Sequence, residues 1–457
     1  MQIPVPHVFK RYDIRGIAGE ELTPELATAI GRATGTFLRR RGKSDVVVGR
    51  DGRLSGPEYA ARLIDGLRAA GVRVLDLGIC PTPVMYFAIH HFGAGGGVAV
   101  TASHNPPEYN GFKINCGPDS LYDDDIQEIR RLIEAEDYET GDAPVERRPV
   151  IPDYAAALRR QFGALASRPK VVVDAGNGTA ALVAPDLLRG LKCRVVELYC
   201  TVDGRFPNHE ADPTVADNLA DMIRVVREQS ADLGIAFDGD GDRLGVVDET
   251  GAILHGDQLL LLYARQVLAD RPGATVISEV KSSQVLYDEI ARAGGRPLMW
   301  KTGHSLIKAK MKETGAALAG EMSGHMFFAD RYYGFDDAIY AACRLLELLD
   351  AAGRPLSRLL VDLPGTVNTP ELRHPCPEPY KAPLVQAVLD HFRRDREVID
   401  IDGVRVRFPG GWGLVRASNT QPILVLRFEA DTSDRLQAIQ DEVMAVIRKY
   451  QREIVPS

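Results

Sequence analysis

One alternation of apolar and polar positions recurs along the chain. A short run of β-branched and apolar residues enters a loop of glycine, aspartate, asparagine or serine, and an amphipathic segment follows, as in DVVVGRDGRLS, GVAVTASHNPP, KVVVDAGNGTA and LGIAFDGDGDR. Runs of three to five apolar residues are typical of strands covered on both faces, and segments such as 56–70 would supply the covering helices. The pattern predicts an α/β protein built from repeated strand–loop–helix modules.

The last part of the chain has a different pattern. GWGLVRASNTQPILVLRFEA predicts a strand, a polar loop and a second strand, without an intervening helix. A helix is predicted to follow, because apolar residues then recur at three- and four-residue spacing: Leu436, Ile439, Val443, Val446 and Ile447. This segment is expected to form a separate α+β domain.

Composition shifts predict where the modules end. The segments 139–154 and 362–383 are charged and rich in proline, which is typical of linkers. The stretch between them is too long for one typical module, so a further boundary is expected near the turn at 248–254. Four domains are predicted: 1–149, 150–252, 253–364 and 365–457.

Charge and composition narrow the classes of partner. The chain of 457 residues is 45% hydrophobic and carries a formal net charge of -8, so no basic stripe for nucleic acid is expected. Its six cysteines lack the paired spacing of a zinc site, which favours reduced thiols. Neither a secretory leader nor an apolar run of membrane-spanning length is seen, so we expect a cytoplasmic protein without a membrane partner.

The loop FDGDGDRLG carries the first candidate chemistry. Asp238, Asp240 and Asp242 alternate with glycines directly after an apolar run, so three carboxylates can converge on a cation. Hard oxygen ligands favour magnesium or calcium. Glu249 completes the spacing of an EF-hand, but that loop needs glycine where Arg243 stands, and helices where these flanks predict strands. Magnesium is favoured; a solvated acidic turn is the alternative.

Ser103, in TASHNPPEYNG, is the second candidate. No G-x-S-x-G surrounds it, and adjacent side chains rarely point at one another, so a relay with His104 is not expected. The alternative is a plain turn serine. A magnesium site without a nucleotide-binding P-loop indicates phosphoryl chemistry in which the protein carries the phosphate, and Ser103 would be that carrier. A phosphoserine oxygen could then complete the coordination left open by the three aspartates.

A third loop, GEMSGH, brings glutamate, serine and histidine together between glycines. Glu321, Ser323 and His325 offer the donors and acceptors that suit vicinal hydroxyls of a sugar. The same hexapeptide also fits a plain hairpin turn.

A fourth loop, RASNTQP, follows the first predicted strand of the last domain. A guanidinium fork, two hydroxyls, an amide and turn N–H groups can together bind a phosphate dianion. The candidate ligands are Arg416, Ser418, Asn419 and Thr420.

These four loops, in this order, resemble the α-D-phosphohexomutase superfamily. TASHNP resembles its phosphoserine loop, DGDGDR its magnesium loop, GEMSGH its sugar-recognition loop and RASNTQP its phosphate-binding loop; KRYDIRG and KTGHS also match. The resemblance spans essentially the whole chain. GEMSGH and RASNT resemble the bacterial phosphomannomutase/phosphoglucomutase branch, whereas phosphoglucosamine mutases carry GEQSGH and a loop like RPSGTEP. Gln421 departs from the threonine expected there and leaves the phosphate ligands intact.

The resemblance implies both a fold and a reaction. The fold would be three related α/β domains with mixed sheets plus a C-terminal α+β domain, around a central cleft. Phosphorylated Ser103 would donate its phosphoryl group to a mannose or glucose 1- or 6-phosphate, and the resulting 1,6-bisphosphate would turn over and return a phosphoryl group from its other end. Mg²⁺, glucose 1,6-bisphosphate as activator and intermediate, hexose phosphate substrates and a monomeric state are implied with it.

The resemblance also assigns roles to further residues. Arg243 would stabilise the transferring phosphoryl group, and the candidates for the general acid/base are His104, Lys113 and His304. An ion pair with Asp13 is the structural alternative for Arg15. The remaining residues implied in the cleft are Tyr12, Arg15, Lys281 and Gly303.

Rival functions remain open at this stage. A metal- and sugar-binding protein without turnover could use the same carboxylates and hydroxyls, but it has no use for a serine in TASHNP. A phosphatase would use Ser103 transiently and release phosphate to water. Among mutases, the alternatives are a phosphoglucosamine mutase and a phosphoglucomutase restricted to glucose.

Overall fold

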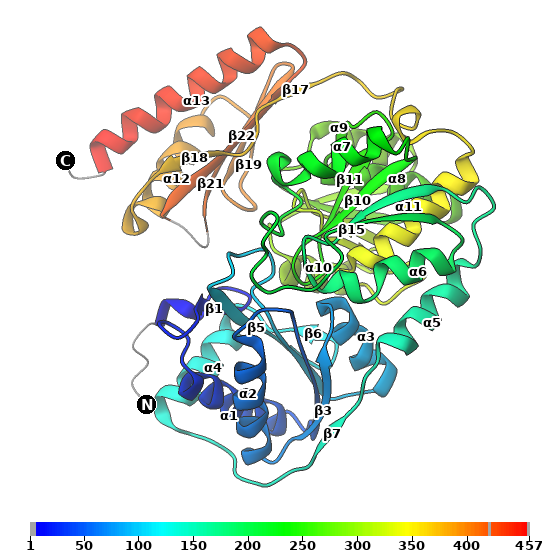
Figure 1. Ribbon diagram of the computed structural model, residues 1–457. Helices are drawn as coiled ribbons and strands as arrows, with labels where there is room; N and C mark the ends of the chain where they lie inside the picture. The colour runs from blue at the N-terminus through cyan, green and yellow to red at the C-terminus, as the bar shows by residue number, and fades with distance from the viewer. Residues whose placement is uncertain (1–5, 419–421, 455–457) are drawn as a thin grey trace.

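The computed structural model describes residues 6–418 and 422–454 and contains four sheets with helices packed on them (Figure 1). The first three sheets mix parallel and antiparallel pairs, and the fourth is antiparallel throughout. The predicted fold class, α/β domains followed by an α+β domain, is confirmed. The short 3-10 helices within the described residues are Pro6–Val8, Thr179–Leu182, Ala216–Leu219 and Leu356–Arg358.

The first sheet has the order β1-β5-β4-β2-β3-β7, with β6 paired to β5. Its strands are buried on both faces: Val46 and Val48 pack against α1, α2 and α4, while Val47 belongs to the core beside α3. The strands are β1 Ile14–Ile17, β2 Asp45–Arg50, β3 Arg73–Ile79, β4 Gly96–Val100, β5 Tyr109–Cys116, β6 Asp119–Ser120 and β7 Val145–Arg147. The helices are α1 Pro24–Arg40, α2 Gly56–Ala69, α3 Thr82–Phe92 and α4 Asp124–Ala135.

The second and third sheets have the orders β12-β11-β10-β8-β9 and β14-β13-β15-β16. The strands of the second sheet are β8 Lys170–Asp174, β9 Arg194–Leu198, β10 Leu233–Phe237, β11 Leu244–Asp248 and β12 Ile253–Leu254. The helices in this part of the chain are α5 Ile151–Phe162, α6 Ala184–Gly190 and α7 Ala220–Glu228. The strands of the third sheet are β13 Thr275–Glu279, β14 Arg296–Trp300, β15 Leu318–Gly320 and β16 Met326–Phe328. The helices in this part of the chain are α8 Gly256–Asp270, α9 Gln284–Arg292, α10 His304–Thr314 and α11 Ala338–Ala352.

The fourth sheet has the order β17-β22-β21-β20-β19, with β18 also paired to β22. Both helices cover one face, where Ile439, Val443 and Ile447 are buried as their spacing predicts. The elements are β17 Val367–Asn368, β18 Leu372–Pro375, α12 Glu378–Phe392, β19 Val398–Ile399, β20 Val404–Phe408, β21 Gly411–Ala417, β22 Ile423–Ala430 and α13 Ser433–Ile454.

Both predicted linkers contain regular structure. In the segment 139–154, β7 pairs in parallel with β3 at the sheet edge, and α5 begins at Ile151. The segment 362–383 contains β17, β18 and the start of α12. These strands have two to four residues and carry no apolar alternation, and Pro379 lies in the first helical turn, where proline costs no hydrogen bond. Short edge strands of this kind leave no periodic signal.

One apolar core is continuous through the first three sheets and includes side chains of α3, α5, α6, α8 and α11. The fourth sheet has its own core, and a smaller apolar contact joins it to the third sheet through Val280, Trp412 and Leu414. All six cysteines are free thiols, as predicted. Within residues 6–418 and 422–454, no helix combines the length and the apolar character needed to cross a membrane.

The buried guanidinium of Arg405 fastens the fourth sheet to the third. Its Nη1 donates to the carbonyl oxygens of Val280 (2.6 Å) and Ser282 (2.7 Å), and its Cζ lies 3.7 Å from the centre of the Trp412 ring. Arg405→Leu leaves both carbonyls without this donor, at a cost of about 1–3 kcal/mol for each buried group. We therefore expect a lower thermal midpoint of unfolding and a red-shifted emission from Trp412.

The matched control for this variant is Arg407→Leu, on the same strand β20. Arg407 is exposed and its guanidinium contacts Glu397. Its loss should therefore change neither the thermal midpoint nor the Trp412 emission measurably. Thermal unfolding and tryptophan emission, which arises only from Trp300 and Trp412, check the prediction. Equal behaviour of the two variants would show that Arg405 does not hold the domain in place.

Candidate active site

Ser103 lies in the loop between β4 and β5 with a φ of 51°, in the left-handed region that non-glycine residues rarely adopt. Its hydroxyl is buried and donates to Asp238 Oδ2 at 2.5 Å, and its N–H donates to Thr101 Oγ1 at 2.9 Å. Backbone strain of this kind persists only where the surroundings enforce it, and it concentrates at functional sites. The loop therefore holds one hydroxyl in a fixed position against the aspartates.

Arg53, which the sequence did not single out, holds the Ser103 loop in place through hydrogen bonds to its backbone. Its guanidinium is fully buried, and its Nε pairs with Asp51 Oδ2 at 3.1 Å. Since an arginine in a polar loop after a strand is usually exposed, DGRLS carried no signal of this role. Its two terminal nitrogens donate to the carbonyl oxygens of Ser103, Asn105, Pro106 and Tyr109.

Asp238, Asp240 and Asp242 converge as predicted. They are fully buried, and one oxygen of each lies within 4.8 Å of the others. Asp238 Oδ1 accepts from the N–H groups of Gly241, Asp242 and Arg243 at 3.0–3.1 Å. Burial, with repulsion from Asp242 and Asp240, holds the pKa of the Asp238 carboxyl well above its ordinary value. The loop concentrates negative charge in a buried place.

Two observations test whether this loop fits a divalent cation. Asp240 Oδ1 is buried and has no hydrogen-bond partner among the described residues, and Asp242 Oδ1 lies 3.3 Å from His325 Nε2. The other oxygens of both carboxylates accept from Lys113 Nζ, at 2.7 Å for Asp240. Burial alone would lower the pKa of Lys113, but the carboxylates of Asp240 and Asp242 raise it. Lys113 and His325 bring two cationic groups against three buried carboxylates, so the donor set fits a hard cation such as Mg²⁺.

Two glycines let these loops approach one another at backbone distance. A Cβ at Gly239 would lie 2.5 Å from the carbonyl oxygen of Ser103. Gly324 has a φ of +87°, and a Cβ there would lie 2.5 Å from the carbonyl oxygen of Leu244. Leu244 N also donates to Gly324 O at 3.0 Å. The Ser103 loop, the aspartate loop and the GEMSGH loop therefore meet through positions that only glycine can occupy.

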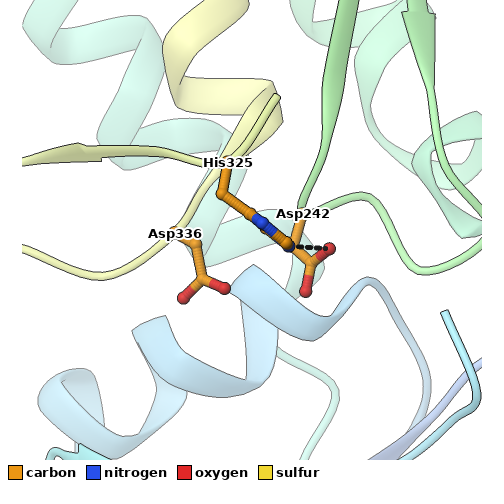
Figure 2. A group of neighbouring side chains, drawn as sticks. All are labelled: Asp242, His325 and Asp336. Carbon is orange, nitrogen blue, oxygen red and sulfur yellow. Dashed lines mark ion pairs between the residues drawn. The ribbon is translucent and has the colours of Figure 1, made fainter. Parts of the chain in front are cut away.

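The GEMSGH loop is a hairpin turn between β15 and β16, and its polar side chains also converge. His325 Nδ1 lies 3.1 Å from Glu321 Oε2 and 2.9 Å from Ser323 Oγ. Figure 2 shows its ring directed at Asp242, whose Oδ1 lies 3.3 Å from Nε2. Burial would lower the pKa of His325, but Asp242 and Glu321 raise it to about 9. The turn thus carries a charged, hydrogen-bonded set of side chains.

His304 begins α10 next to this set, directly after Gly303. The N–H of Gly303 donates to Glu321 Oε1 at 2.7 Å. The Tyr12 ring meets the His304 ring edge-on, with centroids 5.6 Å apart, and the His325 ring also lies 5.6 Å away. Burial, with repulsion from nearby lysines, holds the pKa of His304 well below its ordinary value. His304 is therefore a neutral imidazole in the cluster.

Arg15 forms the ion pair with Asp13 that the sequence left as the structural alternative, and it also contacts the Ser103 loop. Its Nη2 pairs with Asp13 Oδ2 at 2.5 Å, and its Nη1 donates to Asn105 Oδ1 in the Ser103 loop at 2.7 Å. The Ser103 and His104 side chains meet although adjacent side chains rarely do, because His104 Nδ1 lies 3.3 Å from Ser103 Oγ. The left-handed backbone at Ser103 turns the two side chains to the same side.

The Arg416 loop reaches the cluster through Asp402, which the sequence did not single out. Asp402 Oδ2 accepts from Arg416 Nε at 2.6 Å and from Thr302 N at 3.0 Å. The carbonyl of Ser418 accepts from Lys381, whereas Asn419 and Thr420 lie outside the described residues.

Two predicted cations lie at the edge of the cluster. Lys281 Nζ forms an ion pair with Glu371 Oε2 at 3.4 Å. Arg243 follows the aspartates and is partly buried, with its Nη1 3.9 Å from Asp212. Within the described part of the chain, neither side chain forms an ion pair with the three aspartates.

Comparison with known proteins identifies the family. Four family models match in order: phosphoglucomutase/phosphomannomutase alpha/beta/alpha domain I at residues 6–140, domain II at 152–251, domain III at 255–367 and the C-terminal domain at 371–446. The chain belongs to the phosphoglucomutase/phosphomannomutase family. The predicted family and the predicted enzyme class, a phosphohexose mutase, are thereby confirmed.

Individual relatives agree with this assignment over nearly their whole length. The phosphomannomutase/phosphoglucomutase of Pseudomonas aeruginosa is 50% identical over 438 residues, which cover 95% of this chain and 94% of that protein. A phosphoglucomutase of Neisseria meningitidis serogroup A is 46% identical and covers 98% of both. A crystal structure of a phosphoglucomutase/phosphomannomutase family protein from Burkholderia thailandensis matches with a TM-score of 0.91, 46% identity and 97% coverage of both chains.

Proposed function

We propose that this enzyme reversibly transfers a phosphoryl group between C6 and C1 of mannose and glucose phosphates, with Ser103 as the carrier and a hexose 1,6-bisphosphate as the intermediate. One observation carries the proposal: the buried, strained Ser103 hydroxyl lies 2.5 Å from Asp238, within a carboxylate cluster joined to the sugar loop by His325. A carrier hydroxyl, a cation site and a set of sugar ligands thus share one buried place.

The proposed transfer requires a phosphoryl carrier and a group that accepts a proton from the sugar hydroxyl. The bond between the Ser103 oxygen and phosphorus breaks while the sugar hydroxyl oxygen bonds to phosphorus, and the hydroxyl proton passes to a neutral imidazole and on to the Ser103 oxygen. His104 and His304 are the candidate imidazoles, because burial holds the pKa of each well below its ordinary value. Lys113, bound between two carboxylates, serves better as a fixed positive charge than as a base.

Mg²⁺ would be held by Asp238, Asp240 and Asp242 together with an oxygen of phosphorylated Ser103, and would supply charge neutralisation at the transferring group. Arg243 and Arg15 add fixed positive charge near the phosphoserine loop.

Recognition falls to the other two loops. Glu321, Ser323 and His325 would bind the sugar hydroxyls, which are equatorial at carbons 3 and 4 in both mannose and glucose. The phosphate that is not transferred would be bound by Arg416, Ser418, Asn419 and Thr420. The residues proposed to complete the substrate site are Tyr12, Lys281, Gly303 and His304. We further expect a monomer that works in the cytoplasm and is activated by glucose 1,6-bisphosphate.

A coupled assay with Mg²⁺ and glucose 1,6-bisphosphate tests this function on the native protein. Mannose 1-phosphate and glucose 1-phosphate should both be converted to their 6-phosphates, because the proposed sugar ligands do not contact carbon 2. Conversion of glucose 1-phosphate alone would reject the dual specificity. Conversion of glucosamine phosphate, with no conversion of mannose or glucose phosphate, would identify the enzyme as a phosphoglucosamine mutase. Steady release of inorganic phosphate would indicate a phosphatase.

A further inference from the structure

A threonine at the start of α3 contacts the acidic loop twice. Thr82 Oγ1 donates to Asp240 Oδ2 at 2.6 Å, and Thr82 N donates to Asp240 O at 2.8 Å. Thr82 is 2% exposed and Asp240 is fully buried. Both bonds cross from a helix of the first sheet to the loop between β10 and β11 of the second sheet. One residue thus holds both the backbone and the side chain of a proposed cation ligand.

The first turn of α3 leaves Thr82 available for this contact. Pro81 and Pro83 have no N–H group, and the N–H of Thr82 has no acceptor within the helix because it belongs to the first turn. Asp240 O supplies that acceptor. A Cβ at Gly241 would lie 3.3 Å from Pro81 Cβ, so the acidic loop packs directly on this turn. The N-cap of α3 is Pro81, so the helix does not use the Thr82 hydroxyl as a cap.

The two carboxylate oxygens of Asp240 have different surroundings. Oδ2 accepts from Thr82 Oγ1 and from Lys113 Nζ at 2.7 Å, whereas Oδ1 is buried and has no hydrogen-bond partner among the described residues. Two donors on one oxygen restrain the carboxylate from turning and leave Oδ1 available to a cation. Since the Thr82 hydroxyl is neutral, it orients the carboxylate without cancelling its charge.

From this geometry we propose that Thr82 is a positioning residue for the cation ligand Asp240, an inference that rests on the proposed function. Its hydroxyl binds Oδ2 and thereby presents Oδ1 to the divalent cation expected among the three aspartates. Metal ligands depend on such outer hydrogen bonds for their orientation and affinity. The cation site is then assembled from two sheets, because the aspartates follow a strand of the second sheet while Thr82, Lys113 and Ser103 belong to the first.

A purely structural tether between α3 and the acidic loop is the competing explanation. In that case, loss of the hydroxyl would lower the free energy of unfolding and leave the affinity for a cation unchanged. Under our proposal the affinity falls, and the free energy of unfolding changes little. The reason is that Asp240 Oδ2 keeps its bond to Lys113 and Asp240 O keeps its bond to Thr82 N.

The test compares Thr82→Val, which removes the hydroxyl at nearly constant shape, with Thr82→Ser, which keeps it. Binding of Mn²⁺, which prefers oxygen ligands as Mg²⁺ does, is measured on the full chain by electron paramagnetic resonance, with Mg²⁺ as competitor. We expect the Kd of both ions to rise roughly 10- to 100-fold in Thr82→Val and to stay near the native value in Thr82→Ser. In the mutase assay, the Mg²⁺ concentration that gives half the maximal rate should rise in Thr82→Val. Excess Mg²⁺ should restore its kcat, and KM for the hexose phosphate should change little.

Thr36→Val is the matched control. Thr36 is also buried, and its Oγ1 donates to Arg32 O at 2.8 Å and accepts from Glu139 N at 2.9 Å, on α1 and away from the aspartates. This variant should lower the thermal midpoint of unfolding without changing the affinity for Mn²⁺. Equal affinity of Thr82→Val and native protein would overturn the inference, and so would an equal loss of affinity in the two valine variants.

The binding data also separate this inference from the proposed function. A native protein that binds no Mn²⁺ would refute the cation site and the role of Thr82 together. A native protein whose Mn²⁺ binding depends on the Thr82 hydroxyl, but which isomerises no hexose phosphate, would refute the proposed function and support the positioning role.

Discussion

Replacing Ser103 by alanine is expected to abolish isomerisation of both mannose and glucose phosphates, with a loss in kcat of roughly 10³-fold or more. The variant removes the one hydroxyl that lies 2.5 Å from Asp238 in the carboxylate cluster. His104, 3.3 Å away, cannot replace it, because a phosphorylated imidazole would start from a different position and a different leaving group. The coupled assay described above measures the loss.

A second readout ties the loss to phosphoryl transfer. Native protein incubated with glucose 1,6-bisphosphate should carry one phosphoryl group on the peptide that contains Ser103, and Ser103→Ala should carry none. Intact-protein and peptide mass spectrometry separate these outcomes. Full activity in the variant, or a phosphoryl group on another residue, would reject Ser103 as the carrier.

Ser305→Ala supplies the control for loss of a buried hydroxyl. Ser305 lies beside His304 on α10, is 1% exposed, and its Oγ has no hydrogen-bond partner among the described residues. Its removal should leave the phosphorylation intact and the thermal midpoint nearly unchanged. Because Ser103→Ala also leaves Asp238 Oδ2 without its donor, circular dichroism and thermal unfolding should accompany the kinetics to show that the variant is folded.

The sequence predicted the elements whose residues carry a periodic signal. Val46, Val47 and Val48 form a strand buried on both faces because three adjacent β-branched residues can be satisfied only between two layers of helices. The spacing of Ile439, Val443 and Ile447 predicted α13 for a similar reason. The strands β7 and β17 had no such signal, since each pairs at an edge through its backbone and buries few side chains.

For the site, the sequence predicted residues whose chemistry is unusual for a loop and missed those that act through geometry. Three aspartates that alternate with glycines favour a cation site from the sequence alone. Arg53 and Asp402 look like ordinary surface charges in the sequence, and they become informative only because folding buries one under Ser103 and places the other between Arg416 and Thr302.

Magnesium is expected to stabilise the native fold and Asp240→Asn to remove most of that gain. The buried carboxylates of Asp238, Asp240 and Asp242 face two cationic groups, Lys113 and His325, so without a divalent cation the folded state bears uncompensated negative charge. Binding of a cation to the folded state alone adds about 2.7 kcal/mol at 100 times its Kd. Thermal unfolding in EDTA and in Mg²⁺ should therefore show a clear upward shift for the native protein.

Asp240→Asn removes a negative charge while nearly preserving the shape of the side chain. The asparagine side chain in Asp240→Asn would keep an oxygen able to accept from Thr82 Oγ1, which donates to Asp240 Oδ2 at 2.6 Å in the native protein, while one negative charge is lost. In EDTA, Asp240→Asn should thus unfold at a midpoint close to or above that of the native protein, because like-charge repulsion is relieved. In Mg²⁺ its midpoint should rise little, and its kcat should be roughly 10²-fold or more below native.

Asp217→Asn is the charge-matched control, since Asp217 is exposed and its loss should leave the magnesium response intact. If native protein and Asp240→Asn gained equally from Mg²⁺, the ion would bind elsewhere and the acidic loop would be a structural turn neutralised by Lys113. If neither gained while mutase activity persisted in EDTA, Lys113 and the neighbouring arginines would suffice for the charge of the transferring group. The prediction that the cation binds in the same buried cluster as Ser103 requires a rise in thermal midpoint with Mg²⁺ that depends on Asp240 and accompanies mutase activity.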